Sequence, residues 1–441
     1  MPDPKSGRST AKPLSKALSG LKRTGQVLKQ LSPHVVPPQE AAATFKERRV
    51  ARRQPSGLSL TLADHIDGLN GELWDRLAHQ TLFLSRDYLR VLEAHAPSNL
   101  TPRYALVLHA GEPVAIMLFQ RLTVDGERLR KPGRQGLLSK PLERLEEHLL
   151  VCGNVLVWGP RGLAFAPDAD EATLWHAVGE ALYRLRRADK LLGESDLAMI
   201  KDFSGDSDAA PKALRLLGYR HVDTEPDMVL QVRADWRSFD DYLGSLTSSY
   251  RSGAKKLLKD CAAAGIQLRD ISAQEMKARQ DELHGLYRQV HEAQGLRLAT
   301  LQPSYLPAMA QALGPRFACR VAERDGRLQG FVTAVHDGDT TLGYYVGYDR
   351  ATNAEAPVYL TLLQSTVEDA ICFGSSRLSL GRTALEPKAK MGCQPVPLAC
   401  GVRHRVSALN WLVSALTKTA THEEPPQRSP FKVDKSASTP T

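Results

Sequence analysis

The stretch Phe317-Ala-Cys-Arg-Val-Ala-Glu-Arg-Asp-Gly-Arg-Leu-Gln-Gly-Phe-Val-Thr-Ala-Val335 predicts two antiparallel strands joined by a tight turn. Asp325-Gly326 stands between its two apolar runs, and this dipeptide is among the strongest short signals for a β-hairpin. A helix is expected to begin near Pro357, because apolar residues recur there at steps of three and four. A strand over 377–380, a short helix that ends at Gly392 and a last strand follow. The hairpin therefore opens a unit in which strands and helices alternate.

The same order of elements occurs earlier in the chain. Residues 103–120 predict a hairpin with its turn at Ala110-Gly111-Glu112, and a helix, a strand, a short helix that ends at Gly218 and a final strand follow. The interval from turn to closing glycine is longer in this copy, which places an insertion within residues 121–170. Alternating strands and helices predict an α/β fold, and the repetition predicts two related domains in tandem.

Length and charge set the outer limits of these domains. A chain of 441 residues is too long for one hydrophobic core, and we expect domains over 56–232 and 233–416. They are flanked by a basic tail over 1–55 and a polar, disordered tail over 417–441. The basic tail carries a net +9, equal to the formal charge of the whole chain, so the folded body is neutral. No run of about 18 apolar residues is present, so no membrane-spanning helix is expected. No apolar h-region follows the charged first residues, so no secretory signal peptide is expected either.

Residues 14–31 of the basic tail hold leucines near one helical face, with lysines and arginines largely elsewhere. Such a segment is typical of peripheral binding to an anionic membrane surface; the alternative is a solvated tail with incidental leucines. Because the body is neutral and only 6% of residues are aromatic, no DNA binding is expected. We therefore expect a cytoplasmic protein, associated with the inner face of the cytoplasmic membrane if residues 14–31 bind lipid.

The six cysteines are scattered, and no C-x-x-C pair is present. This pattern predicts reduced, mostly buried thiols of a cytoplasmic protein. Cys393, Cys400 and His404 lie close in sequence, but two cysteines and one histidine are an incomplete ligand set. No metal site is expected.

Two further stretches, Trp236–Lys259 and Leu380–Gly392, complete a family resemblance. The first is a basic helix entering the second domain, and the second is a strand-to-helix corner. With the hairpin they resemble the GCN5-related N-acetyltransferase (GNAT) superfamily, and the tandem arrangement is similar to its FemAB-like branch. The resemblance covers about residues 226–410. It implies mixed, mostly antiparallel sheets flanked by helices, with strands that separate to admit an acyl donor.

The same resemblance implies transfer of an acyl or aminoacyl group to an amine. The implied donor is acyl-CoA or aminoacyl-tRNA, so tRNA is a possible partner. The implied acceptor is an amine of a small molecule, a peptide or a lipid-linked cell-envelope precursor. One departure concerns the donor, because family members that use acetyl-CoA hold its pyrophosphate in a glycine-rich loop before a helix. Residues 348–357 contain no glycine, and Glu355 would repel a phosphate there.

The corner 380–392 carries the first candidates for chemistry. Lys388 and Lys390 are expected to hold phosphates or a developing oxyanion, beside Arg382 at the strand end. Glu386 is expected to orient one of these cations; the alternative is an ordinary ion pair on an exposed turn. In the first copy, Lys201 and Asp202 follow a strand in a similar position.

Two other candidates lie on strands. Tyr345 is a candidate general acid, and strand alternation predicts that Tyr344 and Tyr348 face one side and Tyr345 the other. His404 has an ordinary pKa suited to a general base. In both cases the alternative is a packing residue. The predicted catalytic set is Lys388, Arg382, Tyr345, Glu386 and His404.

A helix over 239–261 carries a basic cluster that includes Lys259. This cluster would grip a tRNA backbone, a lipid-linked diphosphate or a nucleotide, or else form a solvated face. The predicted donor-binding set is Arg350, Lys390, Arg251, Lys255 and Lys256. The alternative to an enzyme is a non-catalytic protein that binds a ligand or partner on a degenerate tandem scaffold. A cleft with Arg382 and Lys388 at its floor would favour the enzyme, and a filled apolar cleft the binding protein.

Overall fold

The computed structural model of the protein describes residue 50 and residues 54–125, 146–192, 195–203, 209–294, 297–406, 410 and 426–432. The chain divides into two compact units, Met1–Gln54 and Pro55–Thr441. All elements discussed below belong to the second unit. The predicted membrane-binding segment 14–31 lies outside the described residues, as do most of the two predicted tails.

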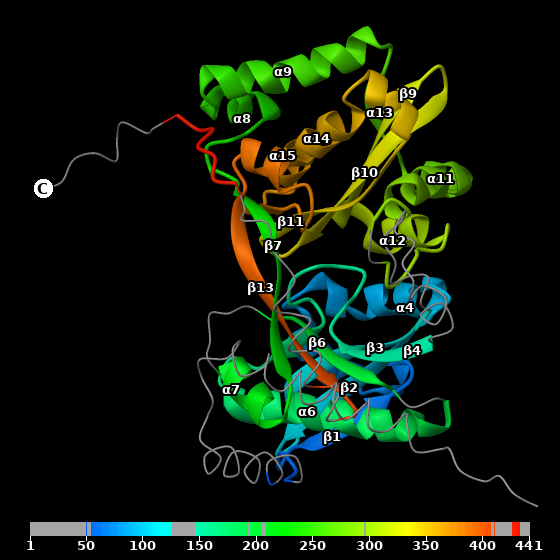
Figure 1. Cartoon of the computed structure of the whole chain (residues 1–441), viewed down its shortest axis with the longest axis vertical. Helices are drawn as coiled ribbons and strands as arrows, with labels where there is room; N and C mark the ends of the chain where they lie inside the picture. The colour runs from blue at the N-terminus through cyan, green and yellow to red at the C-terminus, as the bar shows by residue number, and fades with distance from the viewer. Residues whose placement is uncertain are drawn as a thin grey trace, which may run out of the picture. The chain divides into compact units, whose positions relative to one another are not determined.

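The first repeat contains the predicted hairpin and the helices and strands predicted to follow it (Figure 1). Strands β2 and β3 pair antiparallel, with Leu106 opposite Ile116, so this prediction is confirmed. The strands of this repeat are β1 (Ser59–Ala63), β2 (Leu100–His109), β3 (Glu112–Asp125), β4 (Glu146–Cys152), β5 (Leu163–Phe165), β6 (Leu197–Phe203) and β7 (Arg220–Gln231). Its α-helices are α3 (Gly71–Ala78), α4 (Arg86–His95), α6 (Glu171–Ala188) and α7 (Ala209–Leu216).

The second repeat has the same order of elements. Its hairpin turns at Asp325 and Gly326, whose φ angles of 53° and 75° match the two-residue turn that an Asp-Gly pair favours. Its strands are β8 (Gln267–Asp270), β9 (Phe317–Arg324), β10 (Arg327–Asp337), β11 (Thr340–Tyr348), β12 (Arg377–Ser379) and β13 (Gln394–His404). Its helices are α10 (Ala273–Ala278), α11 (Gln280–His291), α12 (Tyr305–Leu313), α13 (Arg350–Glu355), α14 (Val358–Cys372) and α15 (Leu385–Lys390).

The two repeats exchange their last strands. The described strands form one 13-stranded sheet in the order β1-β2-β3-β4-β6-β13-β7-β12-β11-β10-β9-β8, with β5 beside β3. The last strand of the first repeat, β7, therefore pairs with β12 of the second, and β13 pairs with β6 of the first. Both strands run through the middle of the sheet in Figure 1. The fold is α/β with a mixed, mostly antiparallel sheet, because only β4–β6 and β11–β12 are parallel among the described pairs.

The helix predicted over 239–261 is two helices, α8 (Phe239–Ser245) and α9 (Ser248–Ala263). Leu246 and Thr247 between them are extended, with ψ angles of 149° and 158°. Leu246 forms a β-bridge with Phe431, and the Thr247 amide donates to the Pro430 carbonyl. Segment 426–432, distant in sequence, thus forms hydrogen bonds with backbone groups that would bond within a continuous helix. This segment lies in the stretch expected to be a disordered tail.

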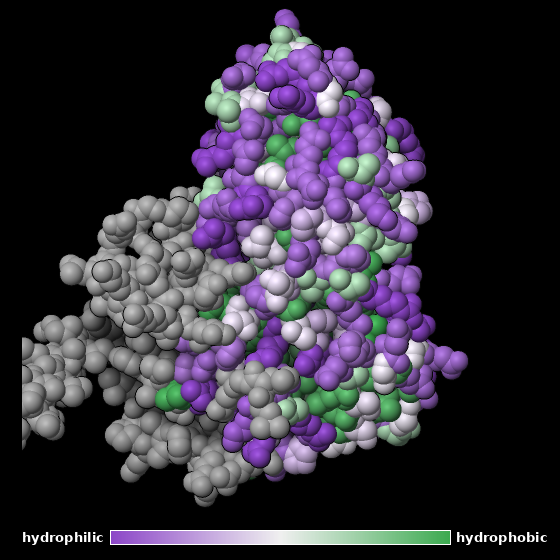
Figure 2. Space-filling view, turned by 90° about the vertical axis from the view of Figure 1, so that its right-hand side faces the viewer, coloured by the Kyte–Doolittle hydropathy of each residue, from purple (hydrophilic) through white to green (hydrophobic). Residues whose placement is uncertain are grey.

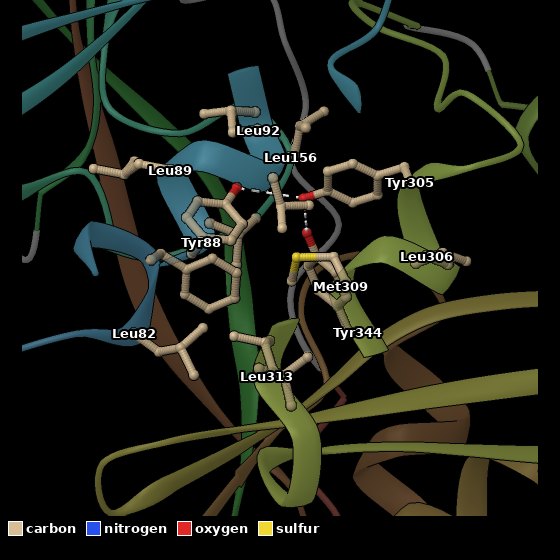
Figure 3. Close-up of a cluster of buried hydrophobic side chains, with 14 of the residues drawn as sticks. Leu82, Tyr88, Leu89, Leu92, Leu156, Tyr305, Leu306, Met309, Leu313 and Tyr344 are labelled. Carbon is tan, nitrogen blue, oxygen red and sulfur yellow. Dashed lines mark hydrogen bonds between the residues drawn. The ribbon is translucent and has the colours of Figure 1, made fainter. Parts of the chain in front are cut away.

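The largest core cluster joins the repeats (Figure 3). Leu89 and Leu92 of α4 face Leu306 and Met309 of α12 across it. Hydrophilic side chains cover most of the described surface on the face seen in Figure 2. Within the described residues, no helix combines the length and apolarity needed to cross a bilayer.

Candidate active site

A cleft of about 450 Å³ opens where β11 and β12 separate. These parallel strands pair from Thr340–Arg377 to Leu342–Ser379, and β11 then continues without β12 beside it. Residues from both repeats line the cleft, because Trp158 and Lys201 come from the first and α11, β11, α14 and α15 from the second. A backbone edge that is unpaired by a strand offers N–H donors to a ligand. The geometry therefore provides an open site at the strand divergence.

The corner that follows β12 is held in an unusual backbone conformation. Gly381, Thr383 and Ala384 have φ angles of 71°, 65° and 47°. A side chain at Gly381 would meet the indole ring of Trp158 at 2.9 Å, so glycine is required there on two grounds. Non-glycine residues with such angles each cost of the order of 1 kcal/mol and cluster at functional sites. This corner directs α15 toward the cleft.

Lys388 of α15 is buried at the wall of the cleft. Its Nζ donates to the carbonyl oxygens of Gly381 (3.1 Å) and Arg382 (2.6 Å). Burial lowers the pKa of this ammonium to about 8, against the opposing attraction of nearby acidic groups. Two of its three N–H donors are thus occupied, and the third is available to a ligand. Lys388 can donate to an oxyanion near neutral pH.

Asp227 of β7 holds the corner from behind. Its carboxylate is buried and accepts from Ser379 Oγ at 2.7 Å and from the Gly381 amide at 2.9 Å. Trp158 Nε1 donates in turn to Ser379 Oγ at 2.5 Å. Desolvation raises the pKa of Asp227, while the Ser379 hydrogen bond lowers it. Through strand exchange, the first repeat thus supplies the carboxylate that fixes the Gly381 carbonyl for Lys388.

Arg382 also depends on the first repeat. Its guanidinium forms an ion pair with Asp202, which is fully buried and has a φ of 55°. Asp202 pairs in addition with Lys201 and accepts from the Gly159 amide at 3.0 Å. Desolvation lowers the pKa of Lys201, and the adjacent carboxylate opposes this shift. Arg382 and Lys201, which the sequence placed at equivalent strand ends, both line the cleft.

The predicted alternation of the tyrosines is wrong, because a β-bulge interrupts it. The β10–β11 register shifts between Val332 and Ala334, so that Tyr344 and Tyr345 together oppose Thr333. Both tyrosines consequently line the cleft, with ring centroids 4.6 Å apart. Tyr345 OH donates to the Leu156 carbonyl at 3.1 Å, so its proton is already engaged.

Tyr344 leads from the cleft into a buried polar chain (Figure 3). Its hydroxyl lies 2.8 Å from that of Tyr305, which lies 3.3 Å from that of Tyr88. Asn154 Nδ2 donates to Tyr88 at 2.7 Å, so the chain links the repeats. Burial raises the pKa of Tyr344 well above its usual value. These hydroxyls therefore stay protonated and fix the ring of Tyr344 at the cleft.

Glu225 and His291 also line the cleft and were not among the site residues predicted from the sequence. Glu225 is exposed on β7, and no sequence signal marked it because β7 was assigned to the first repeat alone. His291 ends α11; its ring stacks on Tyr287 at 5.0 Å, and Nε2 lies 3.1 Å from Thr300 Oγ1. The spacing of Tyr287 and His291 by one helical turn is the sequence signal that could have marked His291. Either group can accept the proton of an amine.

The remaining predicted catalytic residues lie elsewhere. Glu386 is on α15 but outside the cleft, with its carboxylate 3.4 Å from Lys390 Nζ and 2.8 Å from Arg428 Nη2. His404 is at the end of β13, opposite Leu197 of β6, and its Nδ1 accepts from the Val406 amide. The structure thus brings Lys388, Arg382 and Tyr345 together and leaves Glu386 and His404 apart from them.

Residues 350–355, in the stretch that replaces a glycine-rich loop, form the short helix α13. At the start of α14, the Val358 amide donates to the Ala356 carbonyl at 2.7 Å and the Tyr359 amide to Asn353 Oδ1 at 2.8 Å. A pyrophosphate would need such amides free. Together with Glu355, this arrangement does not fit a pyrophosphate at the start of α14.

The predicted donor-binding residues are spread over two regions. Arg350 is exposed at the start of α13. Lys255 and Lys256 are exposed on α9, where Lys256 pairs with Asp260 at 2.7 Å, and Arg251 is half-buried beside them. Lys390 borders a second cavity of about 560 Å³. Five of the six cysteines are buried and Cys372 is exposed. In the part of the chain that the structure describes, no group of three acidic, histidine or cysteine side chains is placed to bind a metal.

Comparison with known proteins relates part of this chain to a known domain. The model of the acetyltransferase (GNAT) domain matches residues 248–388. No curated protein sequence matches the chain. Among solved structures, FemX is 12% identical with a TM-score of 0.51, over 78% of this chain and 98% of FemX. A tandem GNAT protein from the clavulanic acid biosynthesis pathway is 12% identical with a TM-score of 0.49, over 79% and 98%. Residues 248–388 therefore contain an acetyltransferase (GNAT) domain around the cleft, which supports a transferase, and the described body has a fold similar to that of FemX.

Proposed function

We propose that the protein transfers an acyl or aminoacyl group from an activated donor to an amine at the β11–β12 cleft. The observation that carries this proposal is the buried Lys388, which lines an open cleft rather than a filled one and donates to two carbonyls of the same corner. The donor is acyl-CoA or aminoacyl-tRNA. The acceptor is an amine of a small molecule, a peptide or a lipid-linked cell-envelope precursor.

The proposed reaction uses the cleft residues in three roles. The acceptor amine attacks the donor carbonyl and forms a tetrahedral intermediate, whose oxyanion is stabilised by Lys388 and by N–H groups on the free edge of β11. His291 or Glu225 takes the proton that the amine loses. The carbon–sulfur or carbon–oxygen bond then breaks, the leaving thiolate or alkoxide takes up the proton that the base removed, and the amide and the free thiol or alcohol are released. Arg382 holds an anionic part of the donor or acceptor, and Tyr345 positions the loop that carries Leu156.

The test measures transfer and binding with one panel of donors. Purified protein is incubated with acyl-CoAs of different chain length and with aminoacyl-tRNAs, each with polyamine, peptide and amino-sugar acceptors, and products are identified by mass spectrometry. We expect one donor class to raise the melting temperature and to give an amide product. If no donor shifts the melting temperature and no product forms, the proposal is overturned.

The basic tail has a separate proposed role. Since the rest of the chain is neutral, we propose that residues 14–31 hold the enzyme at an anionic membrane surface. Deleting residues 1–55 should abolish co-sedimentation with vesicles that contain phosphatidylglycerol and leave transfer to a soluble amine unchanged. Loss of soluble-substrate turnover on this deletion would contradict the division of roles.

A further inference from the structure

Helix α15, which carries Lys388, has six residues and weak ends of its own. A helix of this length is not stable in isolation, so contacts with the rest of the chain must hold it. Its N-cap residue, Ala384, has a φ of 47° and makes no side-chain capping bond. Gly392 follows the other end with a φ of 99°. The position of Lys388 therefore depends on what packs against α15.

Segment 426–432 packs against α15 at both of its ends (Figure 1). In the first turn, Arg428 Nη2 donates to Glu386 Oε1 at 2.8 Å. Beyond the last turn, the ring of Phe431 lies so close to Gly392 that a Cβ added there would collide with it. The segment thus contacts α15 on both sides of Lys388, although it lies outside the matched domain, which ends at residue 388.

The ring of Phe431 belongs to an aromatic cluster that holds the last turn of α15. Its centroid lies 5.9 Å from that of Trp236 and 6.4 Å from that of Tyr242, and the guanidinium of Arg233 lies 5.1 Å from it. Tyr242 OH donates to the carbonyl of Met391, the C-cap residue of α15, at 3.1 Å. The cluster therefore holds the end of α15 by a ring contact and by a hydrogen bond.

The backbone of the segment is fixed by the interruption between α8 and α9. The Thr247 amide donates to the Pro430 carbonyl at 2.8 Å, and the Lys432 amide donates to the Ser245 carbonyl at 3.0 Å. Both groups belong to the short connection at which one helix was expected and two are found. The interruption thus binds the segment that carries the ring of Phe431.

We propose that segment 426–432 holds α15 so that Lys388 stays at the wall of the cleft, with Phe431 as the main positioning residue. Phe431 does not line the cleft, so it acts through α15. The pair of Arg428 with Glu386 is partly exposed and contributes less than the ring, because exposed ion pairs contribute little. This assignment rests on the proposed acyl transfer and adds a part of the chain on which the site depends.

The first experiment measures the burial of Lys388 without any assay of transfer. Reductive methylation with formaldehyde and cyanoborohydride modifies accessible lysine amines, and mass spectrometry follows each lysine of the full chain. Lys388, which is 3% exposed, should react slowly, and Lys256, whose side chain is 73% exposed, should react fast. Phe431→Ala should raise the rate at Lys388 at least about fivefold, because α15 then opens locally. Lys201, buried on β6, is the internal control and should not change, since general unfolding would expose both.

The second experiment measures the rate of transfer as a function of pH. Phe431→Ala should lower kcat about tenfold, as expected when a group that acts in the transition state is misplaced. Burial lowers the pKa of Lys388 to about 8, against the opposing effects of Cys393, Asp227 and Glu225. Because a loosened α15 loses this burial, the alkaline decline of the rate should move to higher pH. A lower stability alone would reduce the rate without moving that decline.

Two further variants serve as controls for stability. Leu214→Ala removes a buried side chain from the core of the first repeat and should lower the melting temperature without moving the alkaline decline. Phe431→Leu keeps an apolar side chain in place and should lie between the wild type and Phe431→Ala in every measurement. It keeps the test decisive if Phe431→Ala does not fold.

The third experiment tests whether Phe431 and Gly392 act together. Gly392→Ala should displace the ring and lower the rate of transfer. Adding Phe431→Ala to it should lower the rate no further, because the contact is already lost. A further loss of about tenfold, the product expected of independent effects, would overturn the proposed contact.

The outcomes distinguish this inference from the proposed function. Equal labelling of Lys388 in the wild type and in Phe431→Ala, with transfer intact, would overturn the positioning role and leave the proposed transfer standing. A rise at Lys201 equal to that at Lys388 would also overturn it, because the segment would then stabilise the whole fold. Labelling of Lys388 that follows Phe431, in a protein that transfers no acyl group, would support the hold on α15 and count against the proposed function.

Discussion

The two repeats share one order of elements but differ where their parallel strands separate, which are β4 and β6 in the first repeat and β11 and β12 in the second. In the second repeat, β11 stays paired with β10 beyond the point where β12 leaves it, and a bulge turns Tyr344 and Tyr345 into the cleft. In the first repeat, β4 ends at Cys152, where its pairing with β6 ends at Ile200, and β5 takes the place beside β3. A pocket of about 360 Å³, bordered by Trp175 and Glu171, remains there.

The loop that leaves β4 explains this difference. After Cys152 it reaches the second repeat, where Trp158 covers Gly381 and Arg161 pairs with Asp337 at 2.7 Å. It then returns, and the Leu118 amide donates to the Gly162 carbonyl. The loop after β4 in the first repeat thus forms one wall of the cleft in the second repeat. The first repeat therefore contributes to the cleft of the second.

The largest expected effect tests this asymmetry directly. Lys388→Met should lower the rate of transfer by about two to three orders of magnitude, the usual effect of removing one oxyanion donor. Burial lowers the pKa of the ammonium to about 8, so below that pH its removal relieves a desolvation cost, whereas the Gly381 and Arg382 carbonyls lose their donor. Because these two effects oppose each other, the melting temperature of the variant should stay close to that of the wild type.

The matched change in the first repeat is Gln80→Ala, at the exposed border of the 360 Å³ pocket. It should leave transfer unchanged in steady-state assays. A loss as large as that of Lys388→Met would show that the first repeat also takes part in transfer and would contradict this asymmetry.

The next effect concerns stability. A side chain at Gly162 would meet the Cα of Gly153 at 2.5 Å, where the loop closes on itself. Gly162→Ala should therefore lower the free energy of unfolding by about 1–3 kcal/mol, as overpacking does. Gly285→Ala, in an exposed helical turn with open space, should raise it by up to about 1 kcal/mol. Denaturant melts of the two variants check both signs, and equal midpoints would show that the loop is not tightly closed.

The exchanged strand gives the third prediction. Asp227→Asn removes a charge that raises the pKa of Lys388 and one acceptor of the Gly381 corner. Transfer should fall about tenfold, as expected for one lost buried charge-assisted hydrogen bond. The rate should decline in the wild type as pH rises through about 8, because the ammonium is lost. In the variant that decline should begin at lower pH. If the decline of the rate at alkaline pH occurs at the same pH in the variant and the wild type, Asp227 has a purely structural role.

Much of the fold, but less of the candidate site, could be predicted from the sequence. The Asp325-Gly326 turn, the repeated element order and the start of α14 near Pro357 are local signals, and each is found in the structure. In the exchange, β7 pairs with β12 and β13 pairs with β6, although each strand could form an equivalent ladder within its own repeat. No local pattern distinguishes these partners, since either strand satisfies the same hydrogen bonds.

The same reason limits the prediction of the site. Lys388 and Arg382 were found because they follow a strand end within one corner of the sequence. Asp227, Trp158 and Glu225 reach that corner only through strand exchange and a loop from the other repeat. The tyrosine alternation failed because the period of two assumes an unbroken ladder, and a bulge adds one residue.

The smallest expected effect is that of Glu386→Gln, and it decides what α15 does on its outer side. Glu386 forms partly exposed pairs with Lys390 and Arg428, and such pairs contribute about 0–1 kcal/mol, so the melting temperature should change little. If the carboxylate orients a catalytic cation, transfer will fall sharply. If it instead only ties α15 to Arg428, transfer should fall at most about twofold to fivefold, within the range of single exposed charge contacts. The alkaline decline of the rate should then stay near pH 8, because Phe431 still holds α15 and the burial that lowers the pKa of Lys388 is unchanged. This result would separate a weak tie on the outer side of α15 from the chemistry that Lys388 performs in the cleft.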